Sequence, residues 1–366
     1  MATIELHQVE KKFGSLHAVK PFDFTIHDGE FIVLLGPSGC GKTTTLRMIA
    51  GLETVTGGRI LLNGADVTDK PARQRDIAMV FQFFALYPHM TVRENIAFPL
   101  QAQGEKRALI DQRVAEVVKL LNIDSLLQFR PGSLSGGDRQ RVALARALVR
   151  RPAAFMMDEP LGALDAEFRE AMRAEIKRLH LAQNATTVYV THDQIEAMAM
   201  GDRIVVMSNA VVQQVGTPVE VYNNPSNLFV ARFMGSPGMN LVTGRYANGA
   251  VNLPGGNQYR VPDKWKPALS KLSDEEVIVG FRPEAAVVPD GQHGQLIAQV
   301  YASDLHGAYS ILHLAFDEQG QIIHARANRE TLYPIGASIH FDLNSDMVRF
   351  FDPGTESALS LEVNHG

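Results

Sequence analysis

The sequence predicts an α/β domain over residues 1–235, followed by a smaller all-β domain over residues 236–366. Up to about residue 235, short apolar runs alternate with longer stretches of helical periodicity, which is the pattern of a sheet with crossover helices. After Met234 the chain changes to short apolar segments separated by turns such as Gly235-Ser-Pro-Gly and Pro353-Gly. Such punctuation is typical of a small β-barrel.

Continuous apolar runs predict the core strands of the first domain, because strands covered on both faces show no alternation. These runs occupy residues 31–35, 77–81, 154–157, 187–190 and 204–207. Between the second and third runs, apolar residues recur at helical spacing, as in Ile110, Val114, Val117 and Leu121. We therefore expect an inserted helical subdomain at about residues 88–150.

Composition limits the classes of function. The chain has 366 residues and a formal net charge of −5, which offers no basic field for nucleic acid. Its single cysteine, Cys40, excludes an internal disulfide and a cysteine-based zinc site. The amino terminus lacks the pattern of a secretion signal, and no apolar run approaches the roughly 18 to 20 residues that span a membrane. We expect the protein to stay inside the cell and any membrane role to be peripheral.

A glycine-rich loop lies between the apolar run 31–35 and a predicted helix over Thr43 to Ala50, and it matches the pattern GxxxxGK[ST]. Backbone N–H groups of such a loop and the amino end of the helix bind phosphate oxygens. Lys42 is expected at the outer phosphates, Thr43 at Mg²⁺ and Thr44 near the inner phosphate. The cofactor-binding residues predicted here are Gly36, Pro37, Ser38, Gly39, Cys40, Gly41, Lys42, Thr43 and Thr44. The first domain is thus expected to have a P-loop NTPase fold with a RecA-like core.

Two adjacent acids, Asp158 and Glu159, follow the apolar run 154–157. We expect Asp158 to hold the Mg²⁺ shell and Glu159 to act as general base toward the attacking water. The alternative is that the pair only caps the turn at Pro160.

The segment Leu134-Ser-Gly-Gly-Asp resembles the signature loop of ABC ATPases. It repeats the phosphate-binding device, since Ser135, Gly136 and Gly137 expose N–H groups at the start of a helix expected near Arg139. Asp138 stands where the family usually has Gln. The resemblance implies a dimer in which the signature of one copy closes over the ATP held by the other.

Four further residues match the family in order. Gln82 resembles the Q-loop glutamine near Mg²⁺ and the attacking water, Asp165 the D-loop aspartate in Gly162-Ala-Leu-Asp, and His192 the switch histidine at the γ-phosphate. Phe13 takes the place of the aromatic that stacks on adenine. The resemblance makes Glu159, His192, Gln82 and Lys42 catalytic. Taken singly, a lone Gln is more often a surface residue, a lone His structural and a lone Phe part of a core.

Other segments resemble the maltose-type sugar importer ATPases. The segment from Phe83 to Ile96 is similar to the stretch on which a membrane subunit docks. Gly235-Ser-Pro-Gly-Met-Asn, Gly280-Phe-Arg-Pro-Glu and Phe351-Asp-Pro are similar to landmarks of the OB-like regulatory (TOBE) domain.

This resemblance implies an ATPase, using ATP and Mg²⁺, that energises uptake of a sugar, oligosaccharide or glycerol-phosphate compound. Implied partners are a second copy or a closely related ATPase subunit, two membrane-spanning permease subunits, an extracytoplasmic solute-binding protein and a regulatory protein at the carboxyl-terminal domain. The implied location is peripheral, on the cytoplasmic face of the inner membrane.

Alternatives stay open. Polyamine, iron and sulfate importer ATPases carry related tails. A soluble ABC ATPase acting on nucleic acid or ribosomes would require a coiled-coil insertion, two ATPase halves or a basic face. A P-loop kinase would leave Ser135 to Gly137 and His192 without a role.

Overall fold

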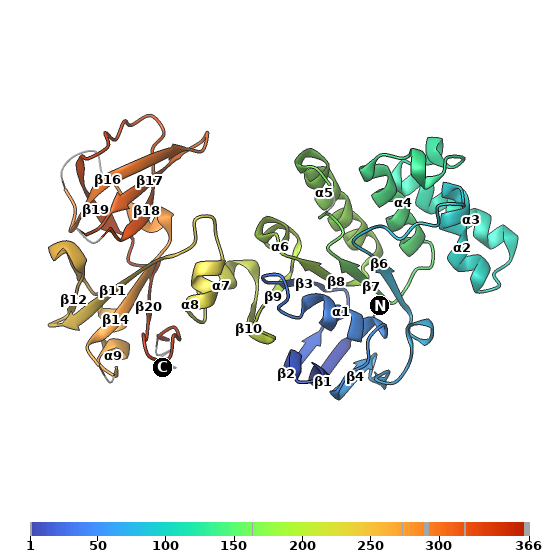
Figure 1. The fold of residues 1–366 in the computed structure, drawn as a ribbon, viewed down its shortest axis with the longest axis horizontal. Helices are drawn as coiled ribbons and strands as arrows, with labels where there is room; N and C mark the ends of the chain where they lie inside the picture. The colour runs from blue at the N-terminus through green and yellow to red at the C-terminus, as the bar shows by residue number, and fades with distance from the viewer. Residues whose placement is uncertain (1, 163, 273, 289–292, 318–319, 362–366) are drawn as a thin grey trace. The chain divides into compact units, whose positions relative to one another are not determined.

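The computed structural model describes residues 2–162, 164–272, 274–288, 293–317 and 320–361. The chain divides into two compact units, Met1–Pro218 and Val219–Gly366 (Figure 1). No helix within the described ranges is long and apolar enough to cross a bilayer.

The first unit is built on a six-stranded sheet in the order β10-β9-β3-β8-β7-β6. Neighbours are parallel from β9 to β6, and β10 is antiparallel to β9. The strands are β3 (Phe31–Leu35), β6 (Ile77–Val80), β7 (Ala154–Asp158), β8 (Thr186–Thr191), β9 (Arg203–Ser208) and β10 (Val211–Gly216). The apolar runs of the sequence thus correctly predicted the five parallel strands, and the α/β class is confirmed.

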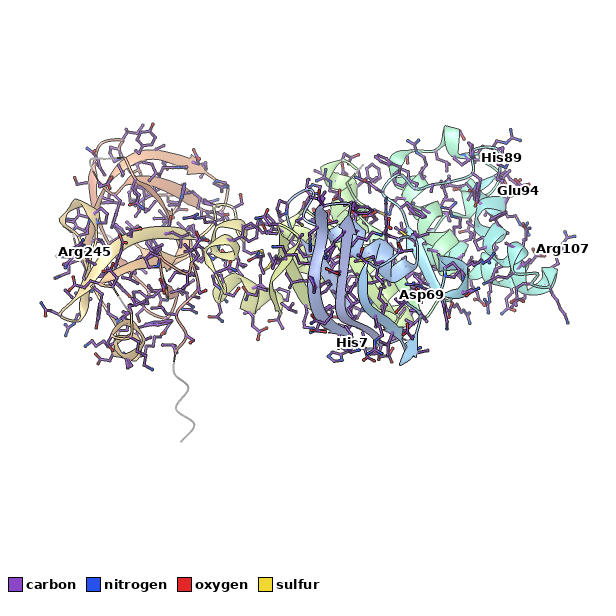
Figure 2. The ribbon with its side chains drawn as sticks, turned by 60° about the horizontal axis from the view of Figure 1, so that its bottom comes forward. His7, Asp69, His89, Glu94, Arg107 and Arg245 are labelled. Atoms are coloured by element: carbon purple, nitrogen blue, oxygen red, sulfur yellow. The ribbon has the colours of Figure 1, made fainter. Side chains whose placement is uncertain are left out.

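A second, antiparallel sheet in the order β2-β1-β4-β5 faces the first across a shared core. Its strands are β1 (Ile4–Phe13), β2 (Leu16–Ile26), β4 (Gly57–Leu62) and β5 (Ala65–Asp66). In β1 the side chains alternate, so that Ile4 and Leu6 are buried whereas His7 is exposed (Figure 2). Helix α1 (Lys42–Ala50) contributes Leu46 and Ile49 to the same core.

The remaining helices of the first unit do not share the α1 side of the six-stranded sheet or are inserted between β6 and β7. Figure 1 shows α5 (Ala166–Gln183) and α6 (Gln194–Met200) on the opposite side of the six-stranded sheet from α1. Between β6 and β7 the chain forms α2 (Val92–Ala102), α3 (Arg107–Leu121) and α4 (Gly136–Leu148), with the short 3-10 turns η2 (Asp124–Leu126) and η3 (Pro131–Ser133); η1 (Ala72–Gln74) precedes β6. Helix α4 begins at Gly136 rather than near Arg139, because the Ser135 side chain caps it.

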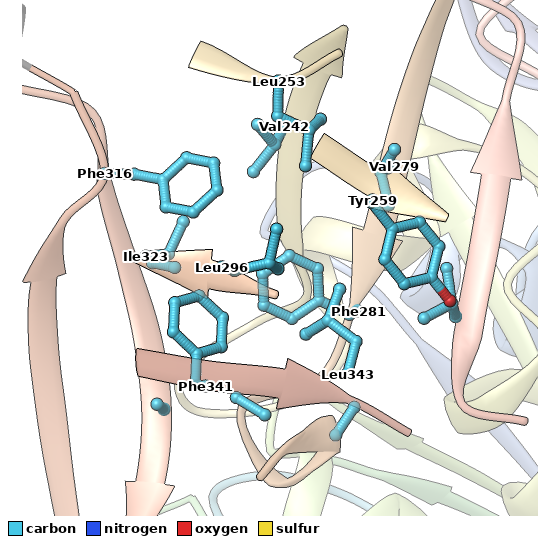
Figure 3. Close-up of a cluster of buried hydrophobic side chains, with 14 of the residues drawn as sticks. Val242, Leu253, Tyr259, Val279, Phe281, Leu296, Phe316, Ile323, Phe341 and Leu343 are labelled. Carbon is cyan, nitrogen blue, oxygen red and sulfur yellow. The ribbon is translucent and has the colours of Figure 1, made fainter. Parts of the chain in front are cut away.

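The second unit contains two antiparallel five-stranded sheets. The first has the order β13-β12-β11-β14-β20 and the second β15-β19-β16-β17-β18. The strands are β11 (Asn240–Ala247), β12 (Ala250–Asn252), β13 (Gln258–Arg260), β14 (Glu276–Phe281), β15 (Ala286–Val287), β16 (Leu296–Leu305), β17 (Ser310–Ala315), β18 (Ile322–Ala327), β19 (Ser338–Leu343) and β20 (Val348–Phe351). Figure 3 shows side chains from both sheets meeting in one core, among them Val242, Phe281 and Phe341.

Short helices complete this unit: α7 (Pro218–Asn223), α8 (Leu228–Phe233), α9 (Lys266–Leu269), η4 (Pro254–Gly256), η5 (Asp263–Trp265) and η6 (Pro283–Ala285). The sequence placed residues 219–235 in the first domain, whereas the structure packs them in the second unit. The physical reason is Arg282, which is 1% exposed and whose guanidinium donates hydrogen bonds to the backbone oxygens of Tyr222, Ala231 and Met234. A side chain of the β-domain therefore holds the segment that precedes it.

Candidate functional site

The glycine-rich loop that is predicted to bind phosphate (residues 36–41) connects β3 to α1, as its position after an apolar run predicted. Packing against two strands defines its ends. A Cβ atom at Gly36 would lie 2.2 Å from the Met207 backbone oxygen, and one at Gly41, where φ is +105°, would lie 2.5 Å from the Ala18 oxygen. Only glycine fits at these two positions.

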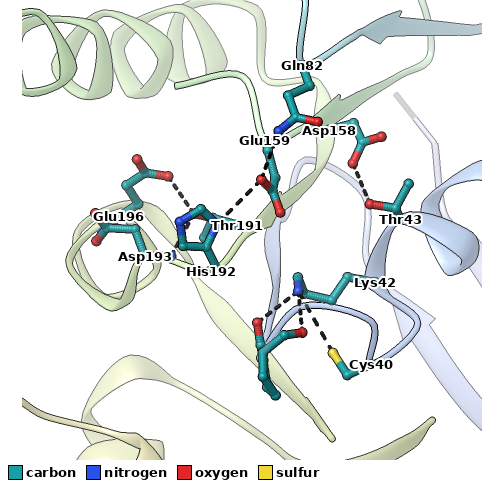
Figure 4. A network of polar contacts seen from close by, with 12 residues as sticks. Cys40, Lys42, Thr43, Gln82, Asp158, Glu159, Thr191, His192, Asp193 and Glu196 are labelled. Atoms are coloured by element: carbon teal, nitrogen blue, oxygen red, sulfur yellow. Dashed lines mark hydrogen bonds and ion pairs between the residues drawn. The ribbon is translucent and has the colours of Figure 1, made fainter. Parts of the chain in front are cut away.

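Lys42 places its charge inside this loop. The side chain is 4% exposed, and Nζ donates to the backbone oxygens of Gly36 at 2.8 Å and Pro37 at 2.9 Å (Figure 4). Cys40 lies beside it and is buried; burial raises the pKa of its thiol, which suits a side chain that fills space rather than reacts. Pro37, Ser38 and Gly39, in the middle of the loop, are exposed.

Two predicted metal ligands meet at the end of β7. Thr43 Oγ1 donates to Asp158 Oδ1 at 2.8 Å (Figure 4), and Asp158 is 5% exposed. Burial raises the pKa of the Asp158 carboxyl, while the Thr43 hydrogen bond acts in the opposite direction. Arg47, one turn after Thr43 on α1, lies 3.9 Å from Asp158 Oδ2. Arg47 was not among the predicted site residues, although its spacing from Thr43 places both on one face of the helix.

Glu159 lies at the centre of a second group (Figure 4). Its Oε2 accepts a hydrogen bond from Gln82 Nε2 at 3.2 Å and lies 3.4 Å from His192 Nδ1. The three residues come from the loops after β7, β6 and β8, so the parallel order of these strands brings them together. The Glu159 backbone has a φ of +42° and donates to the Val190 oxygen at 3.0 Å. A left-handed conformation in a non-glycine residue is costly, and such strain concentrates at functional sites.

A buried hydrogen-bond network around Glu196, which was not predicted from the sequence, supports the His192 loop. Glu196 is 3% exposed, and its Oε2 accepts from Tyr189 at 2.9 Å and from Thr191 at 2.7 Å. Asp193 caps α6 through Ile195 and Glu196 N–H groups. A cavity of about 30 Å³ between Glu159, His192 and Glu196 is large enough for a water molecule. The only sequence signal for this network was an acid one helical turn after His192.

The predicted signature residues lie at the amino end of α4. Ser135 caps α4 by accepting from the Asp138 N–H at 3.1 Å. A Cβ at Gly137 would lie 3.0 Å from the Phe168 ring, so the loop packs closely on α5. Within the described residues, the Ser135 side chain makes its hydrogen bonds to Asp138 of the same loop.

The two remaining predicted residues lie apart from the Glu159 group. Asp165 caps α5 by accepting from the Phe168 N–H at 3.1 Å; Ala163 of the same motif lies outside the described residues. Phe13 ends β1 with 49% of its surface exposed, and Lys11 Nζ lies 4.9 Å from its ring centroid. An exposed ring can stack on a base. The last predicted phosphate-site residue, Thr44, is half-buried at the start of α1.

Family models match both units. Residues 19–162 match the model described as ABC transporter, and residues 235–286 match the MalK OB fold domain. The sulfoquinovosyl glycerol transport ATP-binding protein SmoE of Agrobacterium fabrum is 43% identical over 359 residues, covering 98% of this chain and all of that relative. The trehalose import ATP-binding protein SugC of Mycobacterium tuberculosis is 43% identical, with both chains covered completely.

Solved structures are similar to part of the chain. The dimeric post-hydrolysis state of the ATP-binding cassette MJ0796, bound to ADP and Pi, covers 59% of this chain and 98% of its own, with 32% identity and a TM-score of 0.53. The structure of cbiO1 from Clostridium perfringens, part of the ABC transporter complex cbiONQ, gives 25% identity and a TM-score of 0.57 over 60% of this chain. The identity of 43% to full-length relatives agrees with the glycine-rich loop and the acid pair Asp158 and Glu159 described above. The chain therefore belongs to the ATP-hydrolysing, ATP-binding proteins of ABC transporters.

Proposed function

We propose that this ABC ATPase works as a dimer that binds ATP with Mg²⁺ and energises import of a sugar-type solute through separate permease subunits. The observation that carries the proposal is the meeting of Lys42 and Thr43, at the start of α1, with Asp158 and Glu159, at the end of β7.

The residues present fit Mg²⁺. Magnesium prefers oxygen ligands, and adjacent ligands of an octahedral ion at about 2.1 Å lie about 3.0 Å apart. Thr43 Oγ1 and Asp158 Oδ1 are 2.8 Å apart, which suits neighbouring positions in such a shell. The side-chain oxygen of Gln82 would complete the protein's share. A bound Mg²⁺ would supply charge stabilisation to the transferring phosphoryl group.

Hydrolysis would follow from the placement of the chain's own groups. Lys42 would donate to the outer phosphate oxygens from its position inside the loop. Glu159 would take the proton of the attacking water at Oε2, while Gln82 and His192 hold that carboxylate in place. Phe13 would stack on adenine from its exposed position.

A dimer would complete the nucleotide site. Ser135, Gly136 and Gly137 present the amino end of α4, and Asp165 that of α5. Two-fold pairing would place these groups of one copy over the ATP of its twin. The dimeric cassette bound to ADP and Pi supports this arrangement, because 98% of that cassette is similar to 59% of this chain.

The solute class is inferred from the relatives named for sulfoquinovosyl glycerol transport and trehalose import. The MalK OB fold match over residues 235–286 favours the same branch and a regulatory role for the second unit. Polyamine, iron or sulfate import is the alternative. The protein would act at the cytoplasmic face of the inner membrane, with an extracytoplasmic binding protein delivering solute and a regulatory protein contacting the second unit.

The loop after β6 is suited to docking a permease subunit. Phe83 is 78% exposed, so its ring is accessible to a partner. Arg146 of α4 donates to the backbone oxygens of Phe84 at 2.8 Å and Ala85 at 2.7 Å, and so fixes the loop against α4. A rigid loop with an exposed aromatic can receive a membrane subunit and transmit movement.

The test is substitution of Ser135 by Arg. We expect ATP affinity to persist, because the phosphate-binding loop is intact, while turnover and the ATP-dependent dimer are both lost. Ser125→Arg is the matched control, since Ser125 is an exposed serine on η2 of the same helical part. Full turnover in the Ser135→Arg protein would contradict the shared site. Uptake of radiolabelled sugars by liposomes holding the co-purified permease would then identify the solute class.

A further inference from the structure

The signature loop carries an acid that is not needed to build it. Asp138 Oδ2 accepts a hydrogen bond from the Ser135 hydroxyl at 2.7 Å, and the Ser135 Oγ in turn accepts from the Asp138 N–H at 3.1 Å. The single hydroxyl proton of Ser135 is therefore already used within the same copy. Asp138 closes this local ring.

Charge strengthens the closed arrangement. Asp138 lies in the first turn of α4, where a carboxylate interacts favourably with the positive end of the helix dipole. Arg141 lies 3.4 Å from Asp138 Oδ1, with side-chain exposures of 30% for Arg141 and 24% for Asp138. The amino end of α4, which would face a phosphate, thus already has an anion of its own.

We propose that Asp138 is a positioning residue that holds Ser135 in a self-capped state and raises the ATP concentration needed to close the dimer. The inference rests on the proposed function, in which Ser135 meets the triphosphate of the twin. To donate to that phosphate, Ser135 must turn its proton away from Asp138. The incoming phosphate also meets a like charge at short range.

The isosteric change Asp138→Asn separates these effects from shape. An Asn amide can donate to Ser135 Oγ, which leaves the hydroxyl proton available for phosphate, and it removes the negative charge. We expect the ATP concentration that gives half-maximal dimer to fall by about threefold or more. The gain should shrink between about 0.05 M and 0.5 M salt, because exposed charges are screened. A role confined to helix capping would lower thermal stability without this salt-dependent gain.

Dimerisation is measured by size-exclusion chromatography over an ATP titration, in a Glu159→Gln background that slows hydrolysis. Asp111→Asn is the matched control. Asp111 lies on α3 and is ion-paired with Arg93, and the substitution removes the same charge outside the signature loop. Arg107, the first residue of α3, also lies near Asp111, with Nε 3.8 Å from Asp111 Oδ2 (Figure 2). The control should dimerise as the parent does.

A half-maximal ATP concentration for Asp138→Asn equal to or above that of the parent would overturn the inference. Asp138→Gln provides a second neutral variant should the asparagine protein fold poorly, and thermal unfolding reports on folding. Ser135→Arg separates the two levels of argument. If it fails to block the dimer, the proposed function falls; if it blocks the dimer while both neutral variants behave as the parent, only the role of Asp138 falls.

Discussion

Replacing Arg282 by Met should destabilise the second unit strongly. The side chain is 1% exposed and donates to three backbone oxygens, with Nη2 to Tyr222 at 2.6 Å and Nη1 to Ala231 at 3.2 Å, besides Met234. Its guanidinium also stacks on the Tyr222 ring at 4.0 Å. Burial lowers the pKa of Arg282, and burial with the nearby Glu284 carboxylate raises the pKa of Tyr222 to about 12.

The magnitude follows from what the change leaves behind. Each buried acceptor without a partner costs about 1–3 kcal/mol, and breaking a buried charged network typically costs about 3–5 kcal/mol. Methionine fills part of the volume, so we expect a loss of about 4 kcal/mol in the free energy of unfolding. The lysine variant should lose less than the methionine variant, because its ammonium keeps a positive charge and part of the hydrogen bonding. It should still lose stability, because one ammonium cannot reach all three oxygens as the planar guanidinium does.

The assay is urea unfolding followed by tryptophan fluorescence. The chain has one tryptophan, Trp265, buried in the second unit where it packs edge-on against Phe350 at 5.2 Å, so the signal reports on this unit alone. Arg245→Met is the control, since Arg245 is exposed on β11 (Figure 2) and its loss should stay within about 0.5 kcal/mol. A loss below about 1 kcal/mol for Arg282→Met would refute the reasoning.

Three further outcomes follow from the ATP site. Lys42→Ala should weaken ATP binding about tenfold or more in calorimetry, because a charged donor is lost; unchanged affinity would count against the phosphate loop. Glu159→Gln should lower turnover by about 10² to 10⁴ while ATP binding persists and a locked dimer accumulates, and normal turnover would exclude the general base. For Glu196, burial raises the folded-state pKa above its unfolded value, so wild-type stability should fall as pH rises from about 4.5 through that raised pKa. Glu196→Gln should lack this fall in urea unfolding at several pH values, and an identical pH profile would contradict the assignment.

Local pattern predicted the parts of the fold that depend on neighbours in sequence. The run 31–35, the glycine loop and the helix after it form one continuous motif, and the structure places β3 and α1 there. The strand β1 was not predicted, because its side chains alternate between core and solvent and form no continuous apolar run. The contacts of residues 219–235 with Arg282 were not predicted, because they join positions about 50 residues apart or more.

The candidate site divides in the same way. The phosphate loop and the acid pair could be found from spacing alone, whereas the meeting of Gln82, Glu159 and His192 depends on the order of β6, β7 and β8 in the sheet. Family resemblance supplied that grouping. Arg47, Glu196 and the Ser135 to Asp138 ring were not predicted, because their spacing alone does not specify the side-chain orientations on which these contacts depend.

Gly36 packs closely against the Met207 oxygen of β9, and Gly41 against the Ala18 oxygen of β2. The two sheets, rather than a bound nucleotide, therefore determine how the loop curves. ATP therefore enters a shape that already exists, and little chain entropy is lost when it binds. The same anchoring makes the site sensitive to remote changes: a small slip of β9 or β2 would bend the loop and misplace Lys42. Substitutions in these two strands should therefore alter ATP binding through the shape of the loop.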